Sequence, residues 1–274
     1  MQKLFDLSDK VIVITGAAGL LGKQHSIAIA RSGGSPILLD INKDEVHKLS
    51  EKLNNDFDCN SSSYVLDITD EKQVKNVSLK IMNKYNRVDG LVNNAAINPK
   101  IENNDKKNFS RLENFPLQAW IDDIAVGLTG SFLCSKYFGA LISKNTNGGS
   151  IVNISSDLGI MAPDQRLYKV PGISDELQPV KPVTYSVIKS GLIGLTRYLS
   201  TYWIDKNVRC NAICPGGVEN NQPSDFLCEV EKRIPMGRLA NADEYQGTLI
   251  WMLSKESSYL NGAIIPVDGG RTAW

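Results

Sequence analysis

Residues 11–22 read VIVITGAAGLLG, and this stretch decides the fold of the chain. Its β-branched start predicts a buried parallel strand, and the apolar positions at helical spacing over 20–32 predict a helix. Between them, Gly16, Gly19 and Gly22 allow a tight turn in which backbone N–H groups and the helix N-terminus can face a pyrophosphate. The stretch has the context of a dinucleotide-binding loop, although a purely structural glycine-rich turn would also fit it.

The rest of the chain continues an alternation of strands and helices. Short apolar runs predict further strands at 37–40, 64–67, 88–92, 151–154, 208–213 and 263–267. Helical patterns lie at 43–54, 70–85, 116–145, 183–206 and 241–254. This alternation predicts an α/β fold with a doubly wound parallel sheet of about seven strands and helices on both faces. Residues 1–274 are expected to form a single domain.

Two segments, 98–119 and 157–182, do not fit the alternation. Both are polar, contain proline and are long for loops, and such loops in a compact domain are usually functional or disordered. We therefore expect them on the substrate side of the site. Together they carry seven positive and seven negative side chains, so their charge does not indicate a substrate.

Composition excludes several classes of function. The chain has 30 Lys+Arg against 30 Asp+Glu, and this zero net charge argues against nucleic-acid or anionic-membrane partners. No uninterrupted apolar run approaches the ~18 residues of a membrane span, and the N-terminus has no secretory pattern. Five cysteines without a Cys-x-x-Cys pair suit a reducing cytosol, so a cytoplasmic location is expected. With two histidines far apart, no metal site is expected.

Polar residues follow the predicted strands at the edge where a doubly wound sheet binds its ligand. Asp40 ends the second strand, 18 residues after Gly22. A carboxylate there can accept hydrogen bonds from the adenosine ribose and would repel a 2′-phosphate, which favours NAD over NADP. A helix N-cap is the alternative role for Asp40. Asp67 and Ile68 follow the third strand, and Asn94 and Ala95 follow the fourth.

Tyr185 and Lys189 form the strongest chemical signal. Their i, i+4 spacing on a predicted helix puts the phenol and the ammonium on one face. A nearby cation favours phenolate, so we expect a lowered tyrosine pKa and a phenol able to exchange protons near neutral pH. Ser156 ends the fifth strand, where its hydroxyl could hold a substrate carbonyl. A Tyr-x-x-x-Lys pair alone is common by chance, and it gains meaning from the strand-end residues.

These residues make the chain resemble the short-chain dehydrogenase/reductase family, with its Rossmann-type sheet, over essentially its whole length. The resemblance rests on Gly16, Asn94, Ala95, Ser156, Tyr185 and Lys189, on Asn211-Ala-Ile-Cys-Pro-Gly216 and on Val267-Asp-Gly-Gly270. It implies that Tyr185 is the acid/base, that Lys189 lowers its pKa and binds the nicotinamide ribose, and that Ser156 positions the reacting oxygen.

The same resemblance implies a cofactor site. The implied contacts to NAD come from Gly16, Gly19, Leu21, Gly22, Asp40, Asp67, Ile68, Asn94, Ala95, Tyr185, Lys189, Pro215, Gly216 and Val218. Within this set, Asp67 and Ile68 would cap the adenine, Asn94 would approach the adenosine, and Pro215 to Val218 would hold the carboxamide. Relatives usually pair through helices corresponding to 116–145 and 183–206, which implies a homodimer or homotetramer.

Two positions depart from the family pattern. Single-domain members usually have their second loop glycine at the position of Leu20, whereas this chain has Gly19 and resembles the sugar-nucleotide-modifying branch there. The family also usually has Asn at the position of Gly127, where it holds a water in a proton relay to Lys189. Glycine inside a helix suggests either close approach of a neighbouring segment or a local break in the helix.

The leading hypothesis is an NAD(H)-dependent oxidoreductase that interconverts an alcohol and a ketone on a polar, sugar-like substrate. The loop spacing, together with the 28 residues between Ser156 and Tyr185, also resembles bacterial oxidoreductases of flagellin or surface-sugar modification. A reductase of 3-oxoacyl groups or small ketones is the alternative within enzymes, and a longer apolar pocket would favour it. A non-catalytic NAD-binding sensor or scaffold is the alternative of another class.

Overall fold

The computed structural model describes residues 4–97 and 108–274, and its centre is a parallel sheet of seven strands in the order β3-β2-β1-β4-β5-β6-β7. The strands are β1 (Val11–Thr15), β2 (Ser35–Asp40), β3 (Ser62–Val65), β4 (Gly90–Asn93), β5 (Gly149–Ile154), β6 (Val208–Pro215) and β7 (Ile264–Val267). The predicted doubly wound α/β fold is therefore confirmed. The order reverses between β1 and β4, which is where such sheets bind their ligands.

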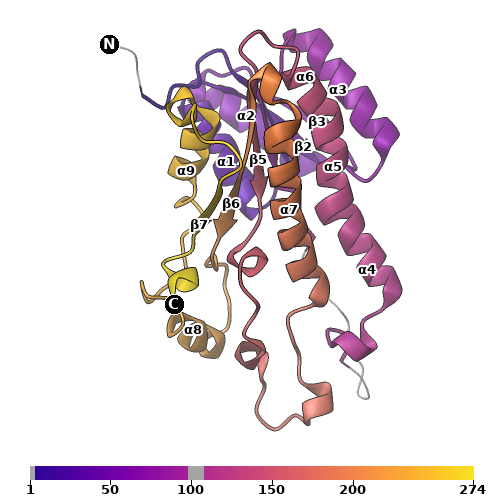
Figure 1. Cartoon of the computed structure of the whole chain (residues 1–274), viewed down its shortest axis with the longest axis vertical. Helices are drawn as coiled ribbons and strands as arrows, with labels where there is room; N and C mark the ends of the chain where they lie inside the picture. Colours follow the sequence, from indigo (N-terminus) through magenta and orange to yellow (C-terminus); the bar gives the residue numbers. More distant parts are fainter. Residues whose placement is uncertain (1–3, 98–107) are drawn as a thin grey trace.

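Helices cover both faces of this sheet (Figure 1). They are α1 (Leu20–Arg31), α2 (Lys43–Phe57), α3 (Glu71–Tyr85), α4 (Leu117–Ile124), α5 (Ser131–Cys134), α6 (Ala140–Ile142), α7 (Val183–Tyr202), α8 (Ser224–Glu231) and α9 (Gln246–Leu253). Helices α1, α2 and α9 pack on one face, and α3, α5, α6 and α7 pack on the other.

Side-chain alternation along the strands builds a core on each face. In β1, Ile12 and Ile14 point into the cluster under α1, α2 and α9, whereas Val11 and Val13 point into the other cluster. Because successive side chains of a strand face opposite sides, one run of β-branched residues supplies both layers. All four of these side chains are at most 5% exposed, as the near-continuous apolar strand predicts.

The segment Leu117–Ile142 is helical throughout but not uniformly α-helical. Two π-helical stretches, Ala125–Gly130 and Ser135–Gly139, separate α4, α5 and α6. By length and composition alone, this 26-residue segment is the one helix of the described part of the chain that could cross a membrane, with a mean hydropathy of 1.3. In the fold, 44% of its apolar window is buried, so such a test by length and composition is weak evidence for a membrane span.

Sequence and structure differ at element ends and in the long connections. Strand β3 begins two residues before the predicted 64 and ends at Val65. Helix α8 was not predicted. Of the segment 98–119, residues 98–107 lie outside the described residues, whereas 157–182 contains three short 3₁₀ helices and extends beyond the sheet next to α8 (Figure 1).

Candidate active site

The glycine-rich loop after β1 packs so tightly that its glycines are sterically required. Gly16 has φ +61°, and a Cβ added there would lie 2.7 Å from the Cα of Ala95. A Cβ on Gly22 would lie 2.1 Å from the carbonyl oxygen of Gly16. Gly19 is the N-cap residue of α1 and has no side chain to fill the N–H positions of the first turn. The loop thus presents the open helix N-terminus that suits a pyrophosphate.

Asp40 at the end of β2 is joined to this loop. Its Oδ2 accepts a hydrogen bond from the backbone N–H of Ala18 at 2.8 Å, and its Oδ1 accepts one from Asn42 at 2.9 Å. The N-cap of α2 is Asn42, whose side chain accepts from Glu45, so the alternative role of Asp40 as a helix cap is wrong. The carboxylate therefore lies beside the glycine-rich loop and is bonded to its backbone.

The residues that follow β3 and β4 differ in how exposed they are. Asp67 is exposed and accepts hydrogen bonds from the backbone and the hydroxyl of Thr69. Ile68 is buried, and its side chain fills the space beside Gly130. Asn94 donates to the carbonyl oxygens of both Thr15 and Gly16 and so ties the end of β4 to the loop. Asn94 therefore shapes the loop, a role that the sequence did not indicate.

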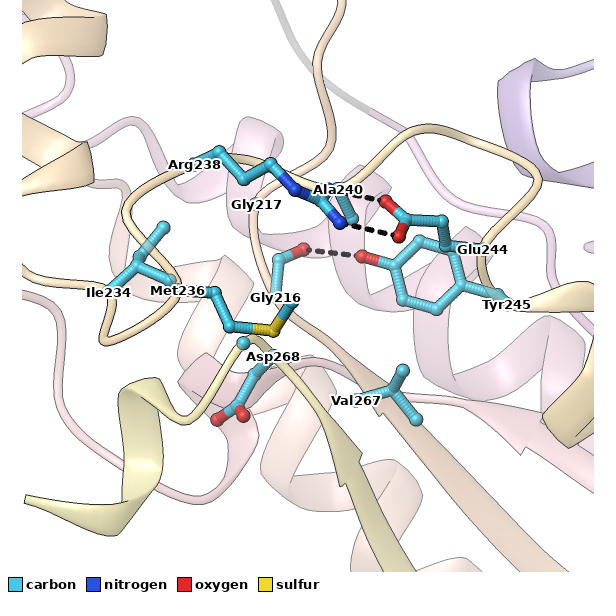
Figure 2. A pocket seen from close by; sticks show the side chains of 11 residues that line it. Gly216, Gly217, Ile234, Met236, Arg238, Ala240, Glu244, Tyr245, Val267 and Asp268 are labelled. Carbon is cyan, nitrogen blue, oxygen red and sulfur yellow. Dashed lines mark hydrogen bonds and ion pairs between the residues drawn. The ribbon is translucent and has the colours of Figure 1, made fainter.

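A cavity of about 130 Å³ lies where β6 and β7 end (Figure 2). Gly216, Gly217, Tyr245 and Asp268 are among its lining residues, and the side chains of Arg238 and Glu244 form an ion pair at 2.6 Å on its wall. A Cβ at Gly216 would lie 2.8 Å from the Cα of Asp268. Pro215 ends β6 directly before this cavity, and Val218 pairs with Ala240 in an isolated bridge. Of the predicted carboxamide residues 215–218, Gly216 and Gly217 line this cavity.

Ser156, Tyr185 and Lys189 are brought together at the carboxyl end of β5. Helix α7 carries Tyr185 in its first turn and Lys189 one turn later. The Nζ of Lys189 donates to the carbonyl oxygen of Ile154 at 2.8 Å and lies 5.8 Å from the centre of the Tyr185 ring. The Ser156 hydroxyl is close enough to Tyr185 to influence its protonation. The geometry thus unites the three residues that the sequence singled out.

Burial dominates the protonation of this group. It raises the pKa of Tyr185, and the Ser156 hydroxyl offsets this only in part. Burial also lowers the pKa of Lys189 to about 8. The expectation that Lys189 lowers the tyrosine pKa is not met in the chain alone, because its ammonium is bonded to the Ile154 carbonyl rather than to the phenol. In the cofactor-free chain the phenol is therefore protonated at neutral pH.

Three charged residues near Tyr185 were not identified as site residues from the sequence. Asp157 and Arg271 form a buried ion pair at 2.9 Å, and the hydroxyl of Ser156 donates to Asp157 at 2.8 Å. The Nζ of Lys181 lies 3.8 Å from the centre of the Tyr185 ring. Lys181 lies four residues before Tyr185, just as Lys189 lies four residues after it, and this equal spacing is the sequence signal that could have identified Lys181. Nothing in the sequence connects Arg271 to this place.

Gly127 combines both features expected of a glycine inside a helix. It lies within the π-helical stretch Ala125–Gly130, and a Cβ there would lie 2.6 Å from Cγ2 of Ile188. Ile188 directly precedes Lys189 and is buried. The space that an asparagine side chain would need is therefore occupied by Ile188. We therefore expect Gly127→Asn to be harmful rather than to increase activity, since the asparagine would have to displace a β-branched side chain.

Comparison with known proteins agrees with this geometry. The sequence profile of the short chain dehydrogenase family matches residues 10–168, and that of the enoyl-(acyl carrier protein) reductases matches residues 174–272. The chain is 33% identical to the 3-oxoacyl-[acyl-carrier-protein] reductase FabG of Thermotoga maritima, over 96% of this chain and 98% of that protein. It is 29% identical to the post-translational flagellin modification protein A of Campylobacter coli, with the same coverage of both chains.

A solved structure matches the whole fold. The short chain dehydrogenase of Leptospira borgpetersenii with bound NAD⁺ superimposes with a TM-score of 0.83 at 28% sequence identity. The match covers 99% of this chain and 96% of that one. The resemblance thus extends from the glycine-rich loop to the C-terminal strand.

Proposed function

The chain belongs to the short-chain dehydrogenase/reductase family, an oxidoreductase family with a nicotinamide cofactor, and from this premise we propose an NAD(H)-dependent enzyme that interconverts an alcohol and a ketone on a polar, sugar-like substrate. The observation that carries the proposal is the meeting of Tyr185, Lys189 and Ser156 beside the carboxyl ends of the strands that hold the glycine-rich loop. The same three residues argue against a non-catalytic sensor or scaffold.

The residues around the loop fit NAD. When bound, NAD(H) takes up or supplies the hydride of the reaction. The loop from Gly16 to Gly22, with Leu21 in the first turn of α1, would face the pyrophosphate, and Asp40 would accept from the adenosine ribose. Asp67, Ile68, Asn94 and Ala95 would line the adenosine side, and Pro215, Gly216 and Val218 the carboxamide side. A 2′-phosphate would meet the Asp40 carboxylate, which favours NAD over NADP.

The proton moves through Tyr185. In ketone reduction the buried phenol gives its proton to the alkoxide, and in alcohol oxidation the phenolate accepts one. Ser156 would hold the reacting oxygen, and for this its hydroxyl must turn from Asp157, to which it now donates. Lys189 keeps a positive charge beside the tyrosine and would bind the nicotinamide ribose. Each step uses a side chain within the group described above.

The likeness to the flagellin modification protein supports a sugar-like substrate, as in surface-glycan or flagellin sugar biosynthesis in the cytoplasm. The likeness to FabG supports the second candidate, a reductase of 3-oxoacyl groups or small ketones. The described part of the segment 157–182 favours the first candidate, because it brings Lys181 and Asp157 to the tyrosine rather than an apolar lining.

The proposal is tested by following NADH absorbance with sugar phosphates, nucleotide sugars, polyols and an acetoacetyl thioester. Tyr185→Phe should reduce turnover at least ~10²-fold and leave cofactor affinity unchanged, whereas Lys189→Ala should reduce both. Turnover confined to the thioester would support the second candidate. Near-normal turnover of Tyr185→Phe would show that another residue carries the proton.

We also propose that the chain forms a homodimer or homotetramer through α4, α5 and α7. Large apolar side chains are exposed along these helices, namely Leu117, Ile121, Phe132, Val187, Tyr198 and Tyr202. Helices α4 and α7 lie side by side, so these residues lie on neighbouring helices (Figure 1). An apolar surface shared by two helices suits a second copy of the chain.

A further inference from the structure

The charges that face the catalytic tyrosine do not balance. The segments 98–119 and 157–182 carry equal numbers of positive and negative side chains. In the described residues, however, Asp157 and Arg271 are the charged groups that influence both Lys181 and Tyr185. Arg271 and Lys181 are two cations and Asp157 is one anion, and Lys189 adds a further positive charge. The surroundings of the tyrosine are therefore positive.

Arg271 and Asp157 compensate each other. Their ion pair measures 2.9 Å, and both side chains are less than a tenth exposed. The other carboxylate oxygen of Asp157, Oδ1, accepts hydrogen bonds from the hydroxyl of Ser156 and from the backbone N–H of Leu158. This carboxylate thus accepts hydrogen bonds from three partners, of which Arg271 is the charged one.

Among the residues that the structure describes, Lys181 has no counter-ion. Its Nζ forms no ion pair with any carboxylate in residues 4–97 and 108–274 and lies instead over the face of Tyr185, 3.8 Å from the ring centre. Burial lowers the pKa of Lys181, and the charge of Arg271 lowers it further, whereas Asp157 raises it. A partly buried cation that lacks a counter-ion is unfavourable. A bound ligand that supplies the negative charge would remove this cost.

We propose that the substrate carries an anionic group, a carboxylate or a phosphate, which pairs with Lys181 beside the Tyr185 ring. This inference rests on the proposed oxidoreductase function and narrows its substrate to hydroxy or keto acids and sugar phosphates. Lys181 is then a specificity-determining residue, because it contacts the substrate without exchanging the proton. Lys181 precedes the first residue of α7, whereas Lys189 lies within this helix, and the two ammonium groups lie 3.8 and 5.8 Å from the centre of the Tyr185 ring.

The test compares three six-carbon ketones in the direction of NADH oxidation: D-fructose 6-phosphate, 5-keto-D-gluconate and neutral D-fructose. Wild type should prefer one of the anionic ketones over fructose, which also distinguishes phosphate from carboxylate. Lys181→Met should lower kcat/KM for that ketone by at least about 30-fold, the effect of losing one partner of a buried charge pair, and should lower kcat/KM for fructose by a smaller factor. Lys169→Met, an exposed lysine of the same segment, should behave as wild type.

A binding measurement separates failure of this inference from failure of the proposed function. Malonate and inorganic phosphate are titrated calorimetrically into the NADH-saturated wild type, Lys181→Met and Lys169→Met. Binding that is lost only in Lys181→Met supports the anion site, even when none of the ketones is reduced and the proposed function fails. Absence of binding to wild type, or equal binding to Lys181→Met, overturns the anion site even when fructose is reduced.

Discussion

Gly127 allows a quantitative test of the contact between the long helix and α7. A Cβ added at this position would lie 2.6 Å from Cγ2, 3.0 Å from Cδ1 and 3.3 Å from Cγ1 of Ile188. Overpacking of this kind costs about 1–3 kcal/mol. Replacing glycine by alanine inside a helix raises the free energy of unfolding by about 0.5–1 kcal/mol. We therefore expect Gly127→Ala to destabilise the protein by ~1 kcal/mol and to lower Tm by about 2–4 °C.

The assay is thermal unfolding at fixed protein concentration, with two comparisons. Gly247→Ala is the matched control, because a Cβ at this helical glycine meets nothing within 4 Å, and it should raise stability by about 0.4–1 kcal/mol. In an Ile188→Ala background, Gly127→Ala should become neutral or stabilising, since the three atoms it would meet are removed. If Gly127→Ala raises Tm in wild type as Gly247→Ala does, the reasoning is refuted.

Three further predictions concern the cofactor, the proton and the assembly. Asp40→Ser should shift the ratio of NAD to NADP affinity at least about tenfold toward NADP, as measured by titration of each cofactor. An unchanged ratio would show that Asp40 does not select between the two cofactors. Since burial raises the pKa of Tyr185, the phenol needed for reduction stays protonated below its ordinary titration range, so kcat/KM for ketone reduction should be nearly constant from about pH 6 to 9. Alcohol oxidation needs the phenolate, so its kcat/KM should rise over the same range, and oxidation that is independent of pH would contradict this. Tyr198→Glu, on the exposed apolar surface of α7, should lower the molar mass of the assembly in light scattering coupled to size exclusion. An unchanged mass would show that the interface lies elsewhere.

The fold was predictable because it depends on local patterns. The run 11–14 and its counterparts are apolar on both faces, and such runs alternating with helices are typical of a parallel sheet between two helix layers. The ends of elements were less predictable, since they depend on capping and pairing. Strand β3 begins early because Ser62 pairs with Ile37 in the neighbouring strand. Helix α8, at eight residues, is too short to show a clear period.

Site residues could be predicted from the sequence where they lie at the end of a strand or are spaced by four positions along one helix. Asp40, Ser156, Tyr185 and Lys189 all meet that condition. Arg271 does not, because it reaches Asp157 across 114 positions of sequence. The spacing of residues also could not predict the direction in which the Tyr185 pKa shifts, because burial decides it. The ammonium of Lys189 donates its hydrogen bond to the carbonyl oxygen of Ile154.

The two π-helical stretches of Leu117–Ile142 fix which residues of this helix point outward. A π turn closes its hydrogen bond one residue later than an α turn, so each stretch accommodates an additional residue. Deleting one residue between Ala125 and Gly130 would restore an α turn and rotate one half of the helix against the other by about 100°. Asp123, which accepts a hydrogen bond from Thr184 at 2.5 Å, and Phe138 in the core could then no longer both keep their partners. A change of even one residue in the length of this helix would therefore disrupt contacts on one of its halves.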